Sequence, residues 1–377
     1  SELRSRAADR KNCPQVRPLG KMGSCASTQV VPATGGMDDL IDQRLAESND
    51  TEAVKILLLG AGECGKSTVL KQMRIICLGG FSGVDERRAH RAVVYENVLD
   101  CMSALCRACA QLKIPFDSPE NQKQAEEVVI SGGKYRNNSD LKLALSQRDN
   151  LLNLWQDKGV QIAFGRSNEF ALPDSTQYFL DQVDALFQED YIPTVDDILR
   201  SRLRTTGIVQ TDIAVEGTVF QFYDVGGQRG ERKKWIHCFD ACTTIMFIAS
   251  LSEYDQTLME DPSRNRLTES LDLFEGLVHL PWFKEIPVIL FLNKKDIFEE
   301  KVKKIDISIY HSDYSGGLDY DEGLKFIKLR YTSRYNSKKM YCHITNATDT
   351  ENVRFVWAAS KHLILEANIA SSGFMMV

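Results

Sequence analysis

The chain has 377 residues, of which 43% are hydrophobic and 26% charged, with a formal net charge of −6. This composition is typical of a globular protein with room for two domains, and the acidic balance argues against nucleic acid as a partner. No apolar run approaches the roughly 20 residues that a membrane-spanning helix needs. The 10 cysteines lack metal-ligand spacing, so we expect buried free thiols and a reducing compartment.

The first segments carry targeting features. Residues 1–21 are basic and lack apolar periodicity, which predicts a non-native or disordered extension. The run Met22–Ser27 matches the N-myristoylation pattern at Gly23, with Cys25 available for palmitoylation, provided that Met22 is the true start. The alternative is a linker of small residues. A short amphipathic helix is predicted over 37–47.

The run Gly60–Ser67 fits the phosphate-binding loop, G-x-x-x-x-G-K-[ST]. The apolar run Val54–Leu59 precedes it and helix-forming residues follow, as the motif requires. In such a loop the backbone N–H groups and the helix N-terminus face an anion. Lys66 can reach the β- and γ-phosphates, and Ser67 can offer its hydroxyl to Mg²⁺. The alternative is a chance glycine-rich turn, which this context disfavours.

The next stretch, about residues 81–191, is helical in pattern. From Arg87 to Leu112 apolar residues recur at helical spacing over several turns. Further helical segments are predicted at 120–130, 139–155 and 176–187. Because no convincing strand pattern appears in this stretch, we expect an all-helical module inserted into an α/β chain.

Strand and helix patterns alternate again from about residue 206. Val219–Tyr223 alternates in polarity, whereas Ile245–Ile248 and Val288–Leu292 are continuous apolar runs. Strands that are apolar on both faces are typical of a parallel sheet covered by helices on each side. A last amphipathic helix is predicted over 352–367.

The run Asp224–Gln228 (DVGGQ) follows the first of these strands. Asp224 at a strand end can hold Mg²⁺, usually through water, and a glycine N–H can reach the terminal phosphate. Asp and Gly are also ordinary turn residues, so the motif gains its meaning from the phosphate loop before it.

The run Asn293–Asp296 (NKKD) predicts recognition of guanine. The Asp296 carboxylate can accept hydrogen bonds from N1–H and the N2 amino group. Adenine has no donor at N1, so it would leave a buried charged group unpaired, at a cost above about 1–3 kcal/mol. The alternative is a polar turn that caps a helix. Thr345–Thr348 follows the next strand, where a backbone N–H could reach guanine O6.

The run Arg200–Gly207 joins the helical module to the sheet. Thr205 can complete the Mg²⁺ shell when a γ-phosphate is present. Arg202, three residues upstream, can neutralise the charge that develops on the transferred phosphoryl group. The alternative is a basic, solvated linker.

Together these motifs resemble the α subunits of heterotrimeric G proteins, from Met22 to the C-terminus and nearest to the inhibitory type. The resemblance implies a Ras-like P-loop GTPase domain, with a mostly parallel sheet flanked by helices, and an inserted all-helical domain. The implied divisions are an N-terminal segment for membrane and βγ contact at 22–53, the GTPase domain at 54–80 and 204–377, and the insert with its linkers at 81–203.

The resemblance also implies a signalling switch that hydrolyses GTP to GDP and couples a membrane receptor to effectors. Arg202 and Gln228 would be catalytic, while Ser67, Thr205 and, through water, Asp224 would hold Mg²⁺. The residues implied for the nucleotide are Glu63, Cys64, Gly65, Lys66, Ser67, Thr68, Asp174, Ser175, Leu199, Arg200, Gly227, Asn293, Lys294, Asp296 and Ala347, with Glu63 facing Arg202 across the cleft.

The implied partners are a βγ dimer, a seven-helix receptor, effectors and a GTPase-activating regulator of G-protein signalling. Lipids on Gly23 and Cys25 would place the protein at the cytoplasmic face of the plasma membrane. Three positions depart from the family pattern. Cys64 replaces a serine and weakens a side-chain hydrogen bond, Asn346 replaces a cysteine, and Gly230 should loosen the second switch.

Three other functions fit some of these residues. An ATP-using P-loop enzyme is disfavoured by the NKKD run. A nucleotide-held scaffold that hydrolyses too slowly to switch is disfavoured by the presence of both Arg202 and Gln228. A self-activating GTPase with fast nucleotide exchange, limited by a GTPase-activating protein, stays open.

Overall fold

The computed structural model describes residues 53–132, 144–335 and 339–371. The lipidation sites Gly23 and Cys25 and the helix predicted over 37–47 lie outside these ranges. Within them, no helix combines the length and the apolar character needed to cross a bilayer.

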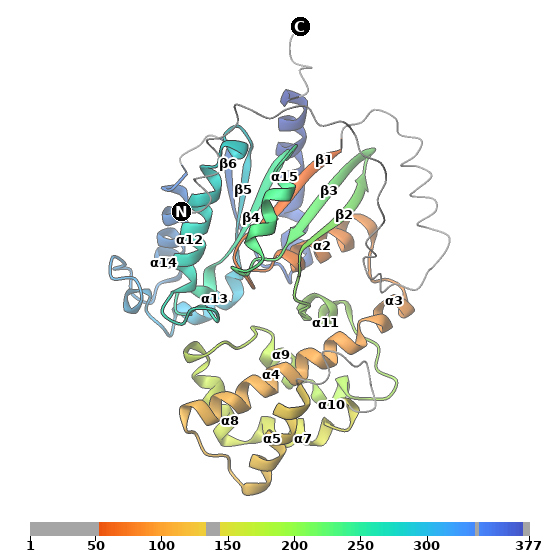
Figure 1. The fold of residues 1–377 in the computed structure, drawn as a ribbon, viewed down its shortest axis with the longest axis vertical. Coiled ribbons are helices and arrows are strands. Elements are labelled where there is room, and N and C mark those ends of the chain that lie inside the picture. Colours follow the sequence, from red (N-terminus) through yellow and green to blue (C-terminus); the bar gives the residue numbers. More distant parts are fainter. Residues whose placement is uncertain (1–52, 133–143, 336–338, 372–377) are drawn as a thin grey trace, which may run out of the picture. The chain divides into compact units, whose positions relative to one another are not determined.

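A six-stranded sheet is the centre of the fold, with the strand order β2-β3-β1-β4-β5-β6 (Figure 1). Neighbouring strands are parallel except β2 and β3, which are antiparallel. The strands are β1 (Val54–Leu59), β2 (Ile208–Val215), β3 (Thr218–Val225), β4 (Thr244–Ser250), β5 (Val288–Asn293) and β6 (Met340–Ile344). The mostly parallel sheet predicted from the apolar runs is therefore confirmed.

The sequence pattern gives no bounds for β2, because this edge strand is mostly exposed and does not alternate clearly. Its turn into β3 is tight. Glu216 and Gly217 both have left-handed backbones, with φ of 52° and 81°. Two consecutive positive φ values are typical of a two-residue hairpin turn.

Helices cover both faces of the sheet. On one face α2 (Lys66–Leu78) and α15 (Thr350–Ser371) share a hydrophobic core with the strands. In this core the ring centres of Trp357 and Phe220 lie 5.4 Å apart. The other face is covered by α12 (Arg266–Val278), α13 (Lys295–Val302) and α14 (Tyr320–Thr332). Both β4 and β5 are buried along their whole length, which explains their continuous apolar sequence.

The insert is built from helices that have a hydrophobic core of their own. The helices that supply this core are α4 (Arg91–Leu112), α5 (Pro119–Gly132), α7 (Arg148–Gln156), α8 (Lys158–Gly165), α9 (Thr176–Leu180) and α10 (Val183–Leu186). In the chain, α3 (Val84–Ala89) precedes them and α11 (Val195–Arg200) follows them. Among the short 3₁₀ segments, η2 (Ser167–Glu169) lies in the insert. The others are η3 (Arg232–Cys238), η4 (Leu251–Glu253), η5 (Pro281–Phe283) and η6 (Ile307–Ile309).

Three helix predictions need correction. In the described part of the segment 139–155, a turn at residues 146–147 precedes α7, which begins only at Arg148. The long helix begins at Arg91 rather than Arg87, because α3 precedes it as a separate element. The segment 176–187 is two short helices rather than one. Gln182 causes the break, since its side-chain amide donates to the Tyr178 carbonyl at 2.9 Å while its backbone N–H turns to Phe179 at 3.2 Å. The Tyr178 carbonyl thus loses its ordinary backbone partner.

Candidate functional site

The loop between β1 and α2 is closely packed against other loops. Gly65, the residue before α2, has φ of 108°, and a Cβ added there would lie 2.4 Å from the Asn293 side-chain nitrogen. Only glycine allows that approach. Lys66 Nζ donates to the carbonyls of Gly60 at 3.0 Å and Ala61 at 2.7 Å. The lysine therefore lies along the loop at the helix N-terminus, an arrangement suited to an anion.

Three oxygen-bearing side chains meet beside this loop. Ser67 Oγ donates to Asp224 Oδ2 at 2.6 Å, and Thr205 Oγ1 lies 2.9 Å from Ser67 Oγ and 3.2 Å from Asp224 Oδ2. Asp224 Oδ1 is buried and has no hydrogen-bond partner among the described residues. Burial raises the pKa of Asp224, with Ser67 and Lys66 opposing that shift. Hydroxyl and carboxylate oxygens in such a group fit Mg²⁺.

Asn293 connects the phosphate loop to the loops after β5 and β6. Its Nδ2 donates to the Cys64 carbonyl at 2.9 Å, while its Oδ1 accepts from the Ala347 N–H at 2.9 Å and the Thr345 hydroxyl at 3.2 Å. Asp296 Oδ1 is buried and lacks a partner in the described part of the chain. A buried carboxylate oxygen of this kind can accept hydrogen bonds from a ligand.

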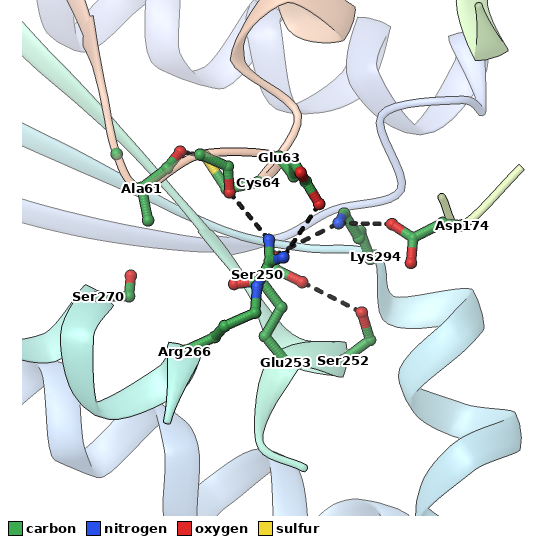
Figure 2. Close-up of polar contacts among 12 residues, drawn as sticks. Ala61, Glu63, Cys64, Asp174, Ser250, Ser252, Glu253, Arg266, Ser270 and Lys294 are labelled. Carbon is green, nitrogen blue, oxygen red and sulfur yellow. Dashed lines mark hydrogen bonds and ion pairs between the residues drawn. The ribbon is translucent and has the colours of Figure 1, made fainter. Parts of the chain in front are cut away.

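A chain of alternating charges runs along the phosphate loop (Figure 2). Arg202 Nη1 lies 2.9 Å from Glu63 Oε1, as predicted, and Glu63 Oε2 lies 2.9 Å from Arg266 Nη1. On its other side, Arg266 Nη2 lies 2.7 Å from Glu253 Oε1. Burial alone would raise the pKa of Glu63, but Arg266 and Arg202 lower it to about 2. Glu63 is therefore ionised at neutral pH and holds both arginines.

Among the described residues, an ion pair connects the insert to the loop after β5, which carries NKKD. Asp174 Oδ2 lies 2.6 Å from Lys294 Nζ, and the Ser175 hydroxyl donates to the Arg200 carbonyl at 3.3 Å. Although burial opposes the charge of Lys294, Asp174 and Glu253 raise its pKa. Lys294 has a left-handed backbone with φ of 63°, an unusual conformation that clusters at binding sites.

The DVGGQ segment lies directly against the phosphate loop. A Cβ added at Gly227 would meet the Ala61 carbonyl and Lys66 Nζ, both at 2.4 Å. Gln228 follows, and a Cβ added at Gly62 would lie 3.3 Å from its Cγ. Gly227 and Gln228 therefore both lie against the phosphate loop.

The segment after Gln228 is fastened to α12 through one carboxylate. Glu269 lies 2.7 Å from Arg229 Nη2 and 2.6 Å from Arg232 Nη1. Hydrogen bonds from Arg229, and further from Arg232, lower the pKa of Glu269 to about 2 against the effect of burial. This carboxylate therefore fixes the segment that carries Gln228.

The Glu269 anchor should make stability depend on acid. Because its pKa falls from 4.5 to about 2 on folding, its contribution is present above pH 4.5 and is lost as the pH falls towards 2. We expect the unfolding free energy of wild type to exceed that of Glu269→Gln by a constant amount above pH 5, and the gap to narrow below 4.5. Urea unfolding at several pH values measures this, with Glu275→Gln on the same helix as control. A difference in unfolding free energy between wild type and Glu269→Gln that does not change with pH would contradict the proposed stabilisation by the Glu269 carboxylate.

Gly230 has neither of the constraints that usually demand glycine. Its φ lies outside the left-handed region, and an added Cβ would meet nothing within 4 Å. We expect Gly230→Ala to raise the unfolding free energy by about 0.4–1 kcal/mol, because alanine restricts the unfolded chain. Gly217→Ala is the matched control: it has equal space but φ of 81°, so it should destabilise. Thermal unfolding compares the two, and a destabilised Gly230→Ala would contradict the prediction.

The remaining predicted residues have varied surroundings. The Cys64 thiol donates to the Ala61 carbonyl at 3.2 Å, and burial raises its pKa, so it stays a neutral thiol. Leu199 is buried, and the Arg200 guanidinium lies 4.5 Å from the centre of the Tyr178 ring. Thr68 lies in the first turn of α2.

Asn346, which departs from the family pattern, uses its side chain in a local turn. Its Oδ1 accepts hydrogen bonds from the N–H and the hydroxyl of Thr348, at 3.1 Å and 2.8 Å. The side chain therefore shapes the turn after β6. A ligand contact by the backbone of this loop would not depend on it.

Sequence reasoning missed Arg266 and Glu253. Glu253 follows β4 closely, and ligands of α/β sheets bind at the carboxyl ends of strands, so its position was a usable signal. Arg266 belongs to no motif. Its role depends on where α12 begins, which only the folded structure shows.

Comparison with known proteins agrees with this site. A family model described as G-protein alpha subunit matches residues 37–364. The chain is 44% identical over 340 residues to a guanine nucleotide-binding protein G(o) subunit alpha of Lymnaea stagnalis, covering 88% of this chain and 94% of the relative. It is 43% identical over 356 residues to the G(o) subunit alpha of Locusta migratoria, covering 93% and 99%.

A third relative, the guanine nucleotide-binding protein alpha-16 subunit of Caenorhabditis briggsae, is 43% identical over 341 residues, covering 88% of this chain and 95% of the relative. The G(o) names agree with the inhibitory-type resemblance predicted from the motifs. With the sheet, the insert and these matches together, the chain belongs to the G-protein α-subunit family, whose members are GTP-hydrolysing signalling switches.

Proposed function

We propose that Arg202 and Gln228 carry the GTP hydrolysis of this α subunit. Both lie beside the phosphate loop, Arg202 through its ion pair with Glu63 and Gln228 next to Gly62. Lys66 and the loop amides would bind the phosphates. Gln228 would orient the attacking water, and Arg202 would swing from Glu63 to neutralise charge developing on the γ-phosphoryl group.

We further propose that Ser67, Thr205 and, through water, Asp224 hold Mg²⁺. The observation that carries the proposed mechanism is the meeting of these three oxygens beside the phosphate loop, with Asp224 Oδ1 left without a described partner. Bound Mg²⁺ would neutralise phosphate charge. Thr205 and Asp224 belong to the two segments that would contact the γ-phosphate. Loss of the γ-phosphate on hydrolysis would therefore free both segments.

Contacts between the insert and the sheet domain favour slow GDP release. The pair Asp174–Lys294 joins the insert to the loop after β5 at 2.6 Å, and Arg202 pairs with Glu63 on the phosphate loop. A nucleotide bound beneath these pairs leaves only after they break. This supports receptor-dependent exchange over the self-activating alternative.

The family implies a βγ dimer, receptors and effectors as partners in general. We propose in addition a regulator of G-protein signalling that accelerates hydrolysis. We also propose attachment to the cytoplasmic face of the plasma membrane through lipids on Gly23 and Cys25. One lipid would bind marginally and two would bind stably.

The test compares two rates on the purified protein with Mg²⁺. Release of fluorescent GDP should be slower than single-turnover GTP hydrolysis, which would make the resting state GDP-bound. Faster release than hydrolysis would support the self-activating alternative. No detectable hydrolysis would overturn the assignment of Arg202 and Gln228, and competition by ATP would overturn guanine recognition.

A further inference from the structure

Asn97, on the long helix α4 of the insert, uses its whole side-chain amide in hydrogen bonds. The two Nδ2 hydrogens go to the Val93 carbonyl at 2.7 Å and the Arg202 carbonyl at 3.0 Å. Oδ1 accepts from the Arg202 N–H at 2.7 Å. Asn97 is only 9% exposed. One side chain therefore binds both backbone groups of the arginine to which we assign catalysis.

These two hydrogen bonds matter because Arg202 belongs to no helix or strand. It lies between α11, which ends at Arg200, and β2, which begins at Ile208. No regular ladder fixes its peptide planes. Bonds to the N–H and the C=O of one residue, made by one rigid amide, fix the direction in which the Arg202 side chain leaves the backbone.

The sheet domain also contacts the chain just before Arg202. Lys71 Nζ, from α2, donates to the carbonyls of Ile198 and Ser201, both at 2.7 Å. Burial lowers the pKa of Lys71 to about 8. Two domains thus contact neighbouring residues of this segment. Among the described residues, Asn97 makes hydrogen bonds with the Arg202 backbone, whereas Glu63 pairs with the Arg202 guanidinium.

We propose that Asn97 is a positioning residue for GTP hydrolysis, through which helix α4 sets the backbone of Arg202. The inference rests on the proposed role of Arg202. It predicts a specific need for an amide. An aspartate of the same shape would still accept from the Arg202 N–H, but its carboxylate would face the Val93 and Arg202 carbonyls without a proton to donate.

The test is single-turnover hydrolysis of preloaded GTP by Asn97→Ala and Asn97→Asp, with and without Arg202→Ala. In the wild-type background each Asn97 variant should slow hydrolysis by about tenfold or more, because a small displacement of a catalytic group is costly. GTP affinity should change by less than about threefold, because, in the described part of the chain, the Asn97 side-chain hydrogen bonds go to Val93 and Arg202 and to none of the residues implied for the nucleotide. In the Arg202→Ala background, the Asn97 substitutions should lower the hydrolysis rate by less than about a further twofold, because the side chain that Asn97 positions has been removed.

Asn121→Ala is the matched control. Asn121 is another asparagine of the insert, and it bonds to Asp157 at 2.7 Å rather than to the linker. It should hydrolyse GTP at the wild-type rate. If Asn97→Ala does not retain nucleotide, Asn97→Asp supplies the test, because it keeps the volume and one hydrogen bond.

Two results would overturn the inference. One is wild-type hydrolysis in both Asn97 variants. The other is a double variant whose loss of hydrolysis rate equals the product of the losses in the Asn97 and Arg202→Ala single variants. That result would mean that Asn97 acts independently of the arginine. Both differ from failure of the proposed function, which would appear as absent hydrolysis in the wild type or as an Arg202→Ala variant with unchanged rate.

Discussion

Arg202→Ala should lower the rate of single-turnover GTP hydrolysis by at least about 10³-fold, with nucleotide still bound. The magnitude is the one already known for arginines of this kind, including those of G-protein α subunits. The physical reason is that the guanidinium neutralises charge that develops only in the transition state, so its loss affects rate more than binding. Phosphate release from preloaded GTP after Mg²⁺ addition measures the effect.

Arg204→Ala is the matched control for this prediction. Arg204 is an exposed arginine two residues further along the same linker. Its removal changes the linker charge equally and should leave the rate within about twofold, as expected for a surface substitution. An Arg202→Ala variant that hydrolyses GTP within a few-fold of wild type would exclude the arginine from the mechanism. Equal losses in both variants would mean that the charge of the linker matters rather than one guanidinium.

Asp296→Asn should weaken guanine nucleotide binding by about 10²-fold or more and should favour xanthine nucleotides instead. The carboxylate can accept from both N1–H and the N2 amino group of guanine, and its Oδ1 is buried without a described partner. An amide replaces one acceptor with a donor, which would face the guanine amino group but match the xanthine carbonyl at C2. A mismatched buried polar pair costs about 1–3 kcal/mol, and more where charge is involved.

Competition of GDP, XDP and ADP against a fluorescent guanine nucleotide measures this preference. Asp321→Asn, an exposed residue in the first turn of α14, serves as the control and should keep guanine selectivity. An Asp296→Asn variant that still prefers guanine over xanthine would show that another group reads the base. Gain of ADP binding would indicate that the pocket excludes adenine by Asp296 alone.

The sequence predicted those parts of the site whose geometry is set locally. The phosphate loop, DVGGQ and NKKD each lie at a strand end, so their chemistry follows from a few consecutive residues and from the rule that such ends meet at one edge of a parallel sheet. Glu63 facing Arg202 was implied by family resemblance, and the 2.9 Å pair agrees with it.

Other parts of the site depend on contacts between residues far apart in the chain. Asn97 and Arg202 are separated by 105 positions, and Arg266 reaches Glu63 across 203. No local pattern records such a pairing. Two other differences have causes of another kind: β2 is a mostly exposed edge strand without clear alternation, and a side-chain hydrogen bond from Gln182 to the Tyr178 carbonyl interrupts the helix predicted over 176–187.

The separate hydrophobic core of the insert has a consequence for how the protein opens. Residues of α4, α5, α7, α8, α9 and α10 pack among themselves, while the sheet has cores on its own two faces. Contact clusters of this kind behave as cooperative units with their own opening free energies. Amide hydrogen exchange should therefore divide the chain into at least two protection classes, and loss of nucleotide should separate the classes further without melting either one.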